Sequence, residues 1–204
     1  MLRSLTAGLF LICGILFLFS CNKTPQIEKL PSDAVVLAFG DSITFGTGAA
    51  PTESYPSVLA GLIGRNVVNA GVPGETTGIA KQRLAATLDE NRPALMLLCL
   101  GGNDFLQRQD EAQAKANLGE MIAVARNRGV AVVLIGVPKL EFGLKLPTFY
   151  QEIARENDIP LESEALKRIL SKSSLKSDAI HPNAAGYRLL AESVAKLLRN
   201  SGAL

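Results

Sequence analysis

The chain has 204 residues, of which 48% are hydrophobic and 20% are charged, with a net charge of +2. This length and balance suit a single domain with a substantial core. Without a Lys/Arg cluster, and with only 5% aromatic residues, the sequence has neither a basic stripe that follows phosphates nor a surface on which bases stack. These features argue against a nucleic-acid partner.

The first twenty residues have the pattern of a secretory signal. Arg3 supplies a positive charge, and the apolar run 5–19 is shorter than a membrane-spanning helix. The letters LFSC at 18–21 resemble the lipobox of bacterial lipoproteins, in which the cysteine is acylated and becomes the new N-terminus. An ordinary cleaved signal or an uncleaved anchor is the alternative.

The lipoprotein interpretation divides the chain into a signal peptide (1–20), a polar tether (21–31) and one folded domain (32–204). Acyl chains on Cys21 would hold the domain at a membrane surface on the extracytoplasmic side. Resemblance to lipoprotein sorting patterns, with Asn22 after the cysteine, points to the outer membrane if the cell is Gram-negative. A soluble secreted or periplasmic protein is the alternative.

The other cysteines and the single histidine limit the chemistry further. Cys13 lies in the signal, and Cys99 lies in an apolar run where a buried small side chain is expected, so no disulfide framework is predicted. With one histidine and no cysteine pair at ligand spacing, we expect neither a metal site nor a cofactor.

Downstream of the tether, short apolar runs alternate with longer amphipathic ones. Strands are predicted over 35–39, 67–69, 94–100, 130–136 and 159–161, and helices over 55–63, 77–91, 109–128, 147–157, 162–170 and 183–200. The middle strands are continuously apolar, as in a parallel sheet with helices on both faces. The pattern predicts an α/β doubly wound fold.

In such a sheet, ligands bind beyond the carboxyl ends of the strands. The segments that follow the first four predicted strands are Gly40-Asp41-Ser42, 71–75 (GVPGE), 101–104 (GGND) and Val137-Pro138. Three of the four are rich in glycine and carry a small polar side chain. We expect their donor groups to converge on one point.

Ser42 is a candidate nucleophile, which requires a base and a group that orients the base. The chain offers one histidine, His181, and Asp178 precedes it by three residues. In a turn, Asp178 could accept the Nδ1 proton while Nε2 faces Ser42. The alternative is an ordinary strand-to-helix turn at Ser42 and a histidine that simply precedes the last helix.

Two other motifs fail on their spacing. A dinucleotide-binding G-x-G-x-x-G that starts at Gly46 would need glycine where Pro51 stands, and no Gly-Lys-Ser/Thr follows. The G-x-S-x-G elbow would need glycine where Thr44 stands.

Four blocks in order carry a family resemblance: GDSI at 40–43, NAGVPGET at 69–76, GGND at 101–104 and DAIHP at 178–182. Together they resemble the SGNH (GDSL-type) hydrolases, in particular the bacterial arylesterase, lysophospholipase and acyl-thioesterase group. The resemblance covers nearly all of the chain after the tether. It implies a three-layer α/β/α, flavodoxin-like fold with a central parallel sheet of five strands.

The resemblance also implies roles for individual residues. Ser42 would be the nucleophile, His181 the general base and Asp178 its orienting partner. The oxyanion hole would consist of the backbone N–H of Ser42, the backbone N–H of Gly74 and the side-chain amide of Asn103.

Two acidic residues within these blocks have no acid–base role in this scheme. Asp41 is interpreted as a hydrogen-bonding anchor of its loop, and Glu75 stands where many members of the family carry Asp. Phe105-Leu106 and the loop 141–146 could line an acyl groove, or they could pack on the core.

The expected function is therefore a serine esterase that hydrolyses carboxylic esters or thioesters of short to medium acyl chains through an acyl-enzyme. Lysophospholipids and aryl esters are candidate substrates. The alternatives are a carbohydrate O-acetylesterase and a lipoprotein that binds lipid without catalysis, since a fold alone does not fix a function. The sequence does not indicate an oligomeric state.

Overall fold

The computed structural model describes residues 24–141 and 143–204. The predicted signal, Cys21 and Asn22 lie outside these residues. Five parallel strands form one sheet in the order β2-β1-β3-β4-β5. The strands are β1 (Val35–Gly40), β2 (Asn66–Gly71), β3 (Leu95–Cys99), β4 (Ala131–Ile135) and β5 (Leu161–Glu162).

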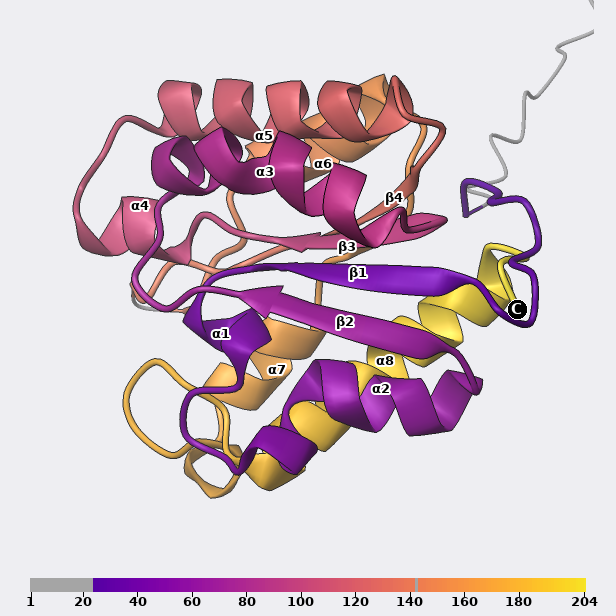
Figure 1. The fold of residues 1–204 in the computed structure, drawn as a ribbon. Coiled ribbons are helices and arrows are strands. Elements are labelled where there is room, and N and C mark those ends of the chain that lie inside the picture. The colour runs from indigo at the N-terminus through magenta and orange to yellow at the C-terminus, as the bar shows by residue number, and fades with distance from the viewer. Residues whose placement is uncertain (1–23, 142) are drawn as a thin grey trace, which may run out of the picture.

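Helices cover both faces of the sheet (Figure 1). They are α1 (Ser42–Phe45), α2 (Tyr55–Ile63), α3 (Thr77–Asn91), α4 (Gly102–Leu106), α5 (Glu111–Arg126), α6 (Thr148–Glu156), α7 (Ala165–Leu170) and α8 (Ala184–Asn200), with two 3₁₀ turns at Pro51–Glu53 and Ser173–Leu175. Helices α3, α5 and α6 form one layer, and α2, α7 and α8 the other. The predicted three-layer α/β/α fold is confirmed.

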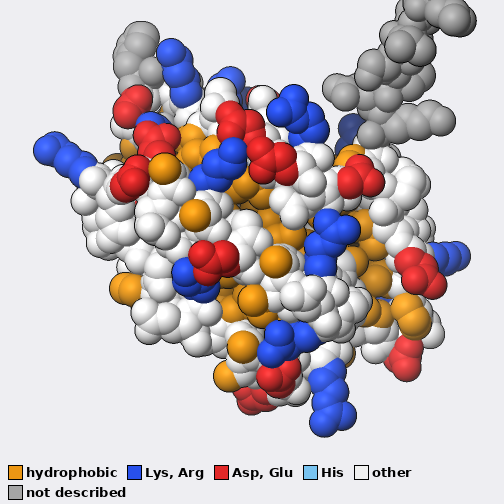
Figure 2. Space-filling model, turned by 90° about the horizontal axis from the view of Figure 1, so that it is seen from above, with side chains coloured by type: hydrophobic (Ala, Val, Ile, Leu, Met, Phe, Trp, Pro, Cys, Tyr) orange, Lys and Arg blue, Asp and Glu red, His pale blue; other side chains and the backbone are white. Residues whose placement is uncertain are grey.

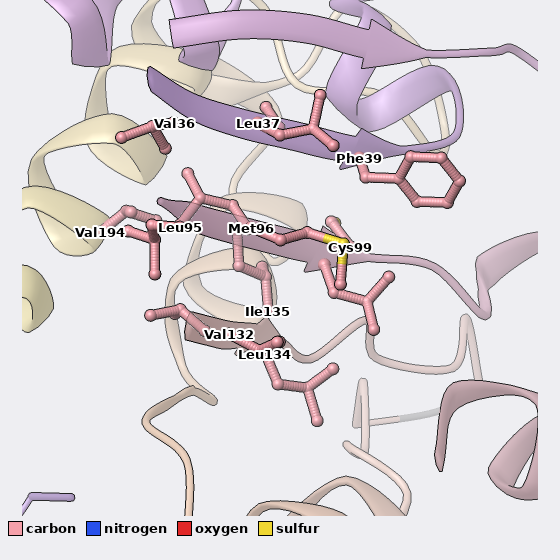
Figure 3. Packing of buried hydrophobic residues seen from close by; sticks show 14 of the residues in the cluster. Val36, Leu37, Phe39, Leu95, Met96, Cys99, Val132, Leu134, Ile135 and Val194 are labelled. Atoms are coloured by element: carbon pink, nitrogen blue, oxygen red, sulfur yellow. The ribbon is translucent and has the colours of Figure 1, made fainter. Parts of the chain in front are cut away.

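The hydrophobic core lies on both faces of the middle strands. Every residue of β3 is buried, as are the last five of β1. Figure 3 shows apolar side chains of β1, β3 and β4 together with Val194 of α8, all members of one buried cluster. Because both faces of the middle strands are covered, their sequences are continuous apolar runs.

The outer face of the α3–α5–α6 layer carries acidic and basic side chains interspersed with apolar ones (Figure 2). Ion pairs link its helices, including Lys81 to Glu120 at 2.8 Å and Lys115 to Glu152 at 2.7 Å. These exposed pairs each contribute little to stability.

Several predicted element boundaries shift in the structure. Helices α2 and α3 have the predicted bounds, whereas β5 is displaced to Leu161–Glu162. Strand β2 runs on to Gly71 because its backbone pairs with β1 in register up to Gly40. The short helices α1 and α4 were not predicted, since four or five residues are too few to show a helical period.

The segment predicted as a tether is partly folded. The Ile27 N–H donates to the Ser201 carbonyl at 2.8 Å, and the Leu30 N–H donates to the Ala203 carbonyl at 2.9 Å. Leu30 is also buried. Residues 27–30 of the predicted tether thus pack on residues 201–203. Within the part that the structure describes, no helix has the length and apolar character of a membrane span.

Candidate active site

Ser42 lies just beyond the carboxyl end of β1 and is the first residue of α1. Asp41 caps this helix by accepting a hydrogen bond from the Ile43 N–H at 3.0 Å. Gly40 makes the sharp exit possible, because a Cβ there would lie 2.2 Å from Thr44 Oγ1 and 2.4 Å from the Cys99 carbonyl oxygen. The chain thus presents Ser42 at the edge of the sheet.

His181 and Asp178 come from the loop that precedes α8. Asp178 Oδ1 accepts hydrogen bonds from the N–H groups of Ile180 and His181, both at 2.8 Å. Its Oδ2 lies 2.7 Å from His181 Nδ1, and His181 Nε2 lies 3.0 Å from Ser42 Oγ. The geometry expected for Ser42, His181 and Asp178 is present, although 139 residues separate Ser42 from His181.

The carboxyl group of Asp178 is ionised over the ordinary pH range. Desolvation raises its pKa, but hydrogen bonds from the His181 ring and from two backbone N–H groups outweigh this and lower the pKa to about 2. An ionised carboxylate only accepts, so His181 Nδ1 carries the proton. His181 Nε2 is then the acceptor that faces the Ser42 hydroxyl.

Asn103 connects the second and third blocks. It lies in α4, and its Nδ2 donates to the Glu75 carbonyl at 2.9 Å and lies 3.4 Å from Asp41 Oδ2. Gly74, directly before Glu75, has a φ of +84° in an exposed loop. The structure therefore brings Asn103 beside the neighbours of both Gly74 and Ser42.

Asp41 is 1% exposed, and its environment disfavours the charged form. Desolvation is the main cause, and the charges of Asp104 and Glu75 add to it, so the pKa of Asp41 rises from 3.8 to about 7 despite the hydrogen bond from Ile43. The hydrogen bond from Ile43 agrees with the interpretation of Asp41 as an anchor of its loop. With a pKa of about 7, the Asp41 carboxyl group is mostly protonated below neutral pH.

We expect the substitution Asp41→Asn to flatten the pH dependence of stability. The folded-state pKa is raised, so the wild-type group contributes most below pH 3.8 and its contribution is lost as the pH rises to about 7. The loss is up to about 4 kcal/mol at about 1.4 kcal/mol per pKa unit, and Asn caps a helix as well as Asp. Urea unfolding at pH 5 and pH 8 covers about two of these pKa units, or about 3 kcal/mol. Equal pH slopes for the two proteins would contradict the expectation.

A cleft of about 570 Å³ opens beside Ser42 and His181. Its apolar lining comes from Ile43, Phe105, Leu106, Val137, Pro138, Leu140, Leu170 and Ile180, and its charged lining from Arg108, Glu111, Lys139 and Glu141. Of the two alternatives for Phe105 and Leu106, a groove lining or packing on the core, the structure shows both residues lining this cleft.

The loop 141–146 contributes less to the cleft than expected. Among its described residues only Glu141 lines the cleft, because Leu146 packs beneath Gly136 and Leu144 faces a separate hollow. Leu170 and Ile180 were not predicted, since Leu170 reads as an ordinary core residue of its helix. No group of three or more His, Cys, Asp or Glu side chains within the described ranges could hold a metal ion.

Comparison with known proteins identifies the family. A family model described as "GDSL-like Lipase/Acylhydrolase family" matches residues 38–189, which include all four blocks. The chain belongs to this GDSL-like lipase/acylhydrolase family. Membership makes it a hydrolase of ester bonds, in agreement with the sequence-based interpretation.

Named relatives in the GDSL-like family are esterases. The chain is 30% identical to an arylesterase from Vibrio mimicus, over 92% of this chain and 96% of the relative. It is 28% identical to the esterase TesA from Pseudomonas aeruginosa, over 88% and 94%. A crystal structure of TesA superimposes with a TM-score of 0.73 at 29% identity, covering 81% of this chain and 98% of that one.

Proposed function

We propose that this protein is a serine esterase that forms an acyl-enzyme on Ser42. The single observation that carries the proposal is the hydrogen-bonded series from Ser42 through His181 to Asp178, with distances of 3.0 and 2.7 Å. Ser–His–Asp groups in this arrangement activate a serine for acyl transfer on unrelated folds. The esterase relatives support the same reaction class.

In the proposed reaction, Ser42 Oγ attacks the carbonyl carbon of the ester while His181 Nε2 takes the hydroxyl proton. The tetrahedral intermediate collapses when the imidazolium gives that proton to the leaving alcohol or thiol. Water, deprotonated by the same nitrogen, then releases the acid from Ser42. Asp178 stays ionised and stabilises the imidazolium throughout.

The oxyanion that forms during the attack needs hydrogen-bond donors to stabilise its negative charge. Ser42 is the first residue of its helix, so its N–H has no partner within the helix. The proposed hole adds the Gly74 N–H and the Asn103 side-chain amide, from two other loops. Donors fixed before reaction stabilise the developing charge without reorganisation.

We expect Asn103→Ala to lower kcat by about 10² to 10³, the usual effect of losing one oxyanion donor. KM should change little, because the donor acts mainly on the transition state. Steady-state hydrolysis of a p-nitrophenyl ester measures both constants. Asn127→Ala, at an exposed position at the end of α5, is the control and should retain full activity.

The proposed substrates are esters of short to medium acyl chains, including aryl esters. Leu106 and Leu140 are 50% and 41% exposed on the cleft beside the nucleophile, which gives an apolar group a surface to bury. The relatives named arylesterase, esterase and thioesterase/lysophospholipase cover this range of leaving groups.

The decisive experiment is a series of p-nitrophenyl esters from acetate to palmitate, combined with a phosphonate ester that labels active serines. We expect the highest kcat/KM at intermediate chain lengths and a phosphonate mass adduct on the peptide that contains Ser42. No hydrolysis at any length would leave a non-catalytic binding protein. Hydrolysis confined to the acetate would indicate an O-acetylesterase.

We also propose that Cys21 is acylated and anchors the domain outside the cytoplasm. The described chain enters the domain at the edge of the sheet opposite α1 and α4 (Figure 1). Ile27 is fixed to the folded body, and six residues extend at most about 20 Å. The catalytic edge would therefore face away from the anchoring membrane. Mass spectrometry of the mature N-terminus tests this; an unmodified N-terminus other than Cys21 would exclude it.

A further inference from the structure

Glu75 forms a nearly buried ion pair beside the proposed oxyanion hole, in a place where the reaction itself requires no carboxylate. Its side chain is 11% exposed, and Arg83 from the second turn of α3 is 26% exposed. Arg83 Nε lies 2.9 Å from both carboxylate oxygens of Glu75, and Nη2 lies 2.8 Å from Oε2. Hydrogen-bonded pairs of this kind are stronger than a pair joined at one exposed point.

The same guanidinium also holds the ends of two strands. Arg83 Nη2 donates to the carbonyl oxygens of Ala70 at 3.0 Å and Gly40 at 3.2 Å. The guanidinium carbon lies 4.1 Å from the centre of the Phe39 ring, which adds a cation–π contact. Arg83 thus connects the Glu75 loop to the carboxyl ends of β1 and β2.

These contacts reach all three segments of the proposed oxyanion hole. Gly40 leads into Ser42, Gly74 directly precedes Glu75, and the Glu75 carbonyl accepts the hydrogen bond from Asn103 Nδ2 at 2.9 Å. The residues of the ion pair are therefore connected to all three segments, through the Arg83 guanidinium and the Glu75 backbone carbonyl.

Packing alone does little to fix the Gly74 loop. Val72, Pro73 and Gly74 are exposed, and a Cβ on Gly74 would meet no atom within 4 Å. The loop is held by the Val72 N–H, which donates to the Gly40 carbonyl at 3.0 Å, and by the contacts of Glu75. At the start of α3, Thr77 is held separately by Asp104, to which its N–H and hydroxyl donate at 2.9 and 2.6 Å. The ion pair is the contact that fixes the Glu75 side chain, next to Gly74.

We propose that Glu75 and Arg83 are positioning residues that align the oxyanion donors of this esterase, an inference that rests on the proposed function. Neither residue lines the cleft beside Ser42 and His181, so both would act through the groups that they hold. Lysine cannot replace Arg83, because one ammonium group cannot meet the carboxylate and two carbonyls in the same planar arrangement.

The test compares Glu75→Gln, Arg83→Lys and Arg83→Met with the wild type, all purified from cells that express the full sequence. We expect kcat to fall about 10- to 100-fold in each, since a displacement of about 1 Å at a catalytic group can cost 10²-fold. KM and the apparent pKa of the kcat/KM profile should not change, because the Ser42–His181–Asp178 geometry is untouched. The rate of Ser42 phosphonylation should fall in parallel with kcat.

A double-mutant cycle and a matched ion pair separate positioning from stability. Glu75→Gln combined with Arg83→Met should lose little more kcat than either single change, as expected for residues that act as one unit. Asp89, also in α3, pairs with Arg128 at 2.8 Å on the exposed surface, and Asp89→Asn should leave kcat unchanged. Circular dichroism at the assay temperature establishes that each variant is folded.

The possible outcomes separate the positioning role from the proposed function. If the wild type hydrolyses esters and folded Glu75 and Arg83 variants keep its kcat and phosphonylation rate, the positioning role is wrong and the proposed function stands. A loss confined to KM would also overturn the positioning role. If the wild type neither hydrolyses esters nor reacts with the phosphonate, both the proposed function and the role that depends on it fall.

Discussion

Replacement of Ser42 by alanine should lower kcat for p-nitrophenyl esters by at least about 10⁴-fold, because loss of a triad nucleophile removes the covalent pathway. Alanine fits the site without new contacts, and Asp41 still accepts the Ile43 hydrogen bond. The folded structure and the thermal unfolding temperature should therefore stay close to those of the wild type. The phosphonate adduct should disappear together with the activity.

The combination of Ser42→Ala with His181→Ala tests whether the two residues act together. We expect the double variant to be no slower than Ser42→Ala alone, because the base has no function without the nucleophile. Ser57, which donates to the Pro51 carbonyl at 2.9 Å outside the cleft, provides the control Ser57→Ala with wild-type activity. Hydrolysis by Ser42→Ala at the wild-type rate would refute the proposed mechanism.

The fold could be predicted where the sequence pattern is local and repeated. Strands β1, β3 and β4 are apolar runs buried on both faces, and α3 is long enough to show its helical period. Strand β5 has two residues, and its place depends on pairing with β4. Such short elements exist because of tertiary contacts, so no window of the sequence indicates them reliably.

The candidate site could be assigned because its residues fall in short blocks, three of them after strands and the fourth, with Asp178 and His181, before α8. Arg83 lacked such a signal, since a basic residue in a polar helix usually lies on a solvated face. Its proposed positioning role depends on the contacts of its side chain with the carbonyl groups at the ends of β1 and β2. These contacts are visible only in the structure. Leu170 enters the cleft for a similar reason, through the placement of α7.

The Asp178→Asn variant should fold normally and lose about 10³-fold in kcat near neutral pH. A buried triad aspartate loses about 10⁴-fold on the same change, and Asp178 is 51% exposed, so water moderates the effect. The side-chain oxygen of the asparagine can still accept from the N–H groups of Ile180 and His181, as Oδ1 does now at 2.8 Å. This fixes the amide so that its NH₂ points at His181 Nδ1.

An NH₂ group at that position forces Nδ1 to act as an acceptor. The proton of the neutral imidazole then resides on Nε2, which faces Ser42 and can no longer take its proton. The kcat/KM of the variant should rise with pH into the alkaline range, as hydroxide replaces the missing base. Measurements from pH 6 to 10 test this, with Asp33→Asn, at an exposed position two residues before β1, as the control. A kcat within threefold of the wild type at neutral pH would show that Asp178 does not select the tautomer of His181.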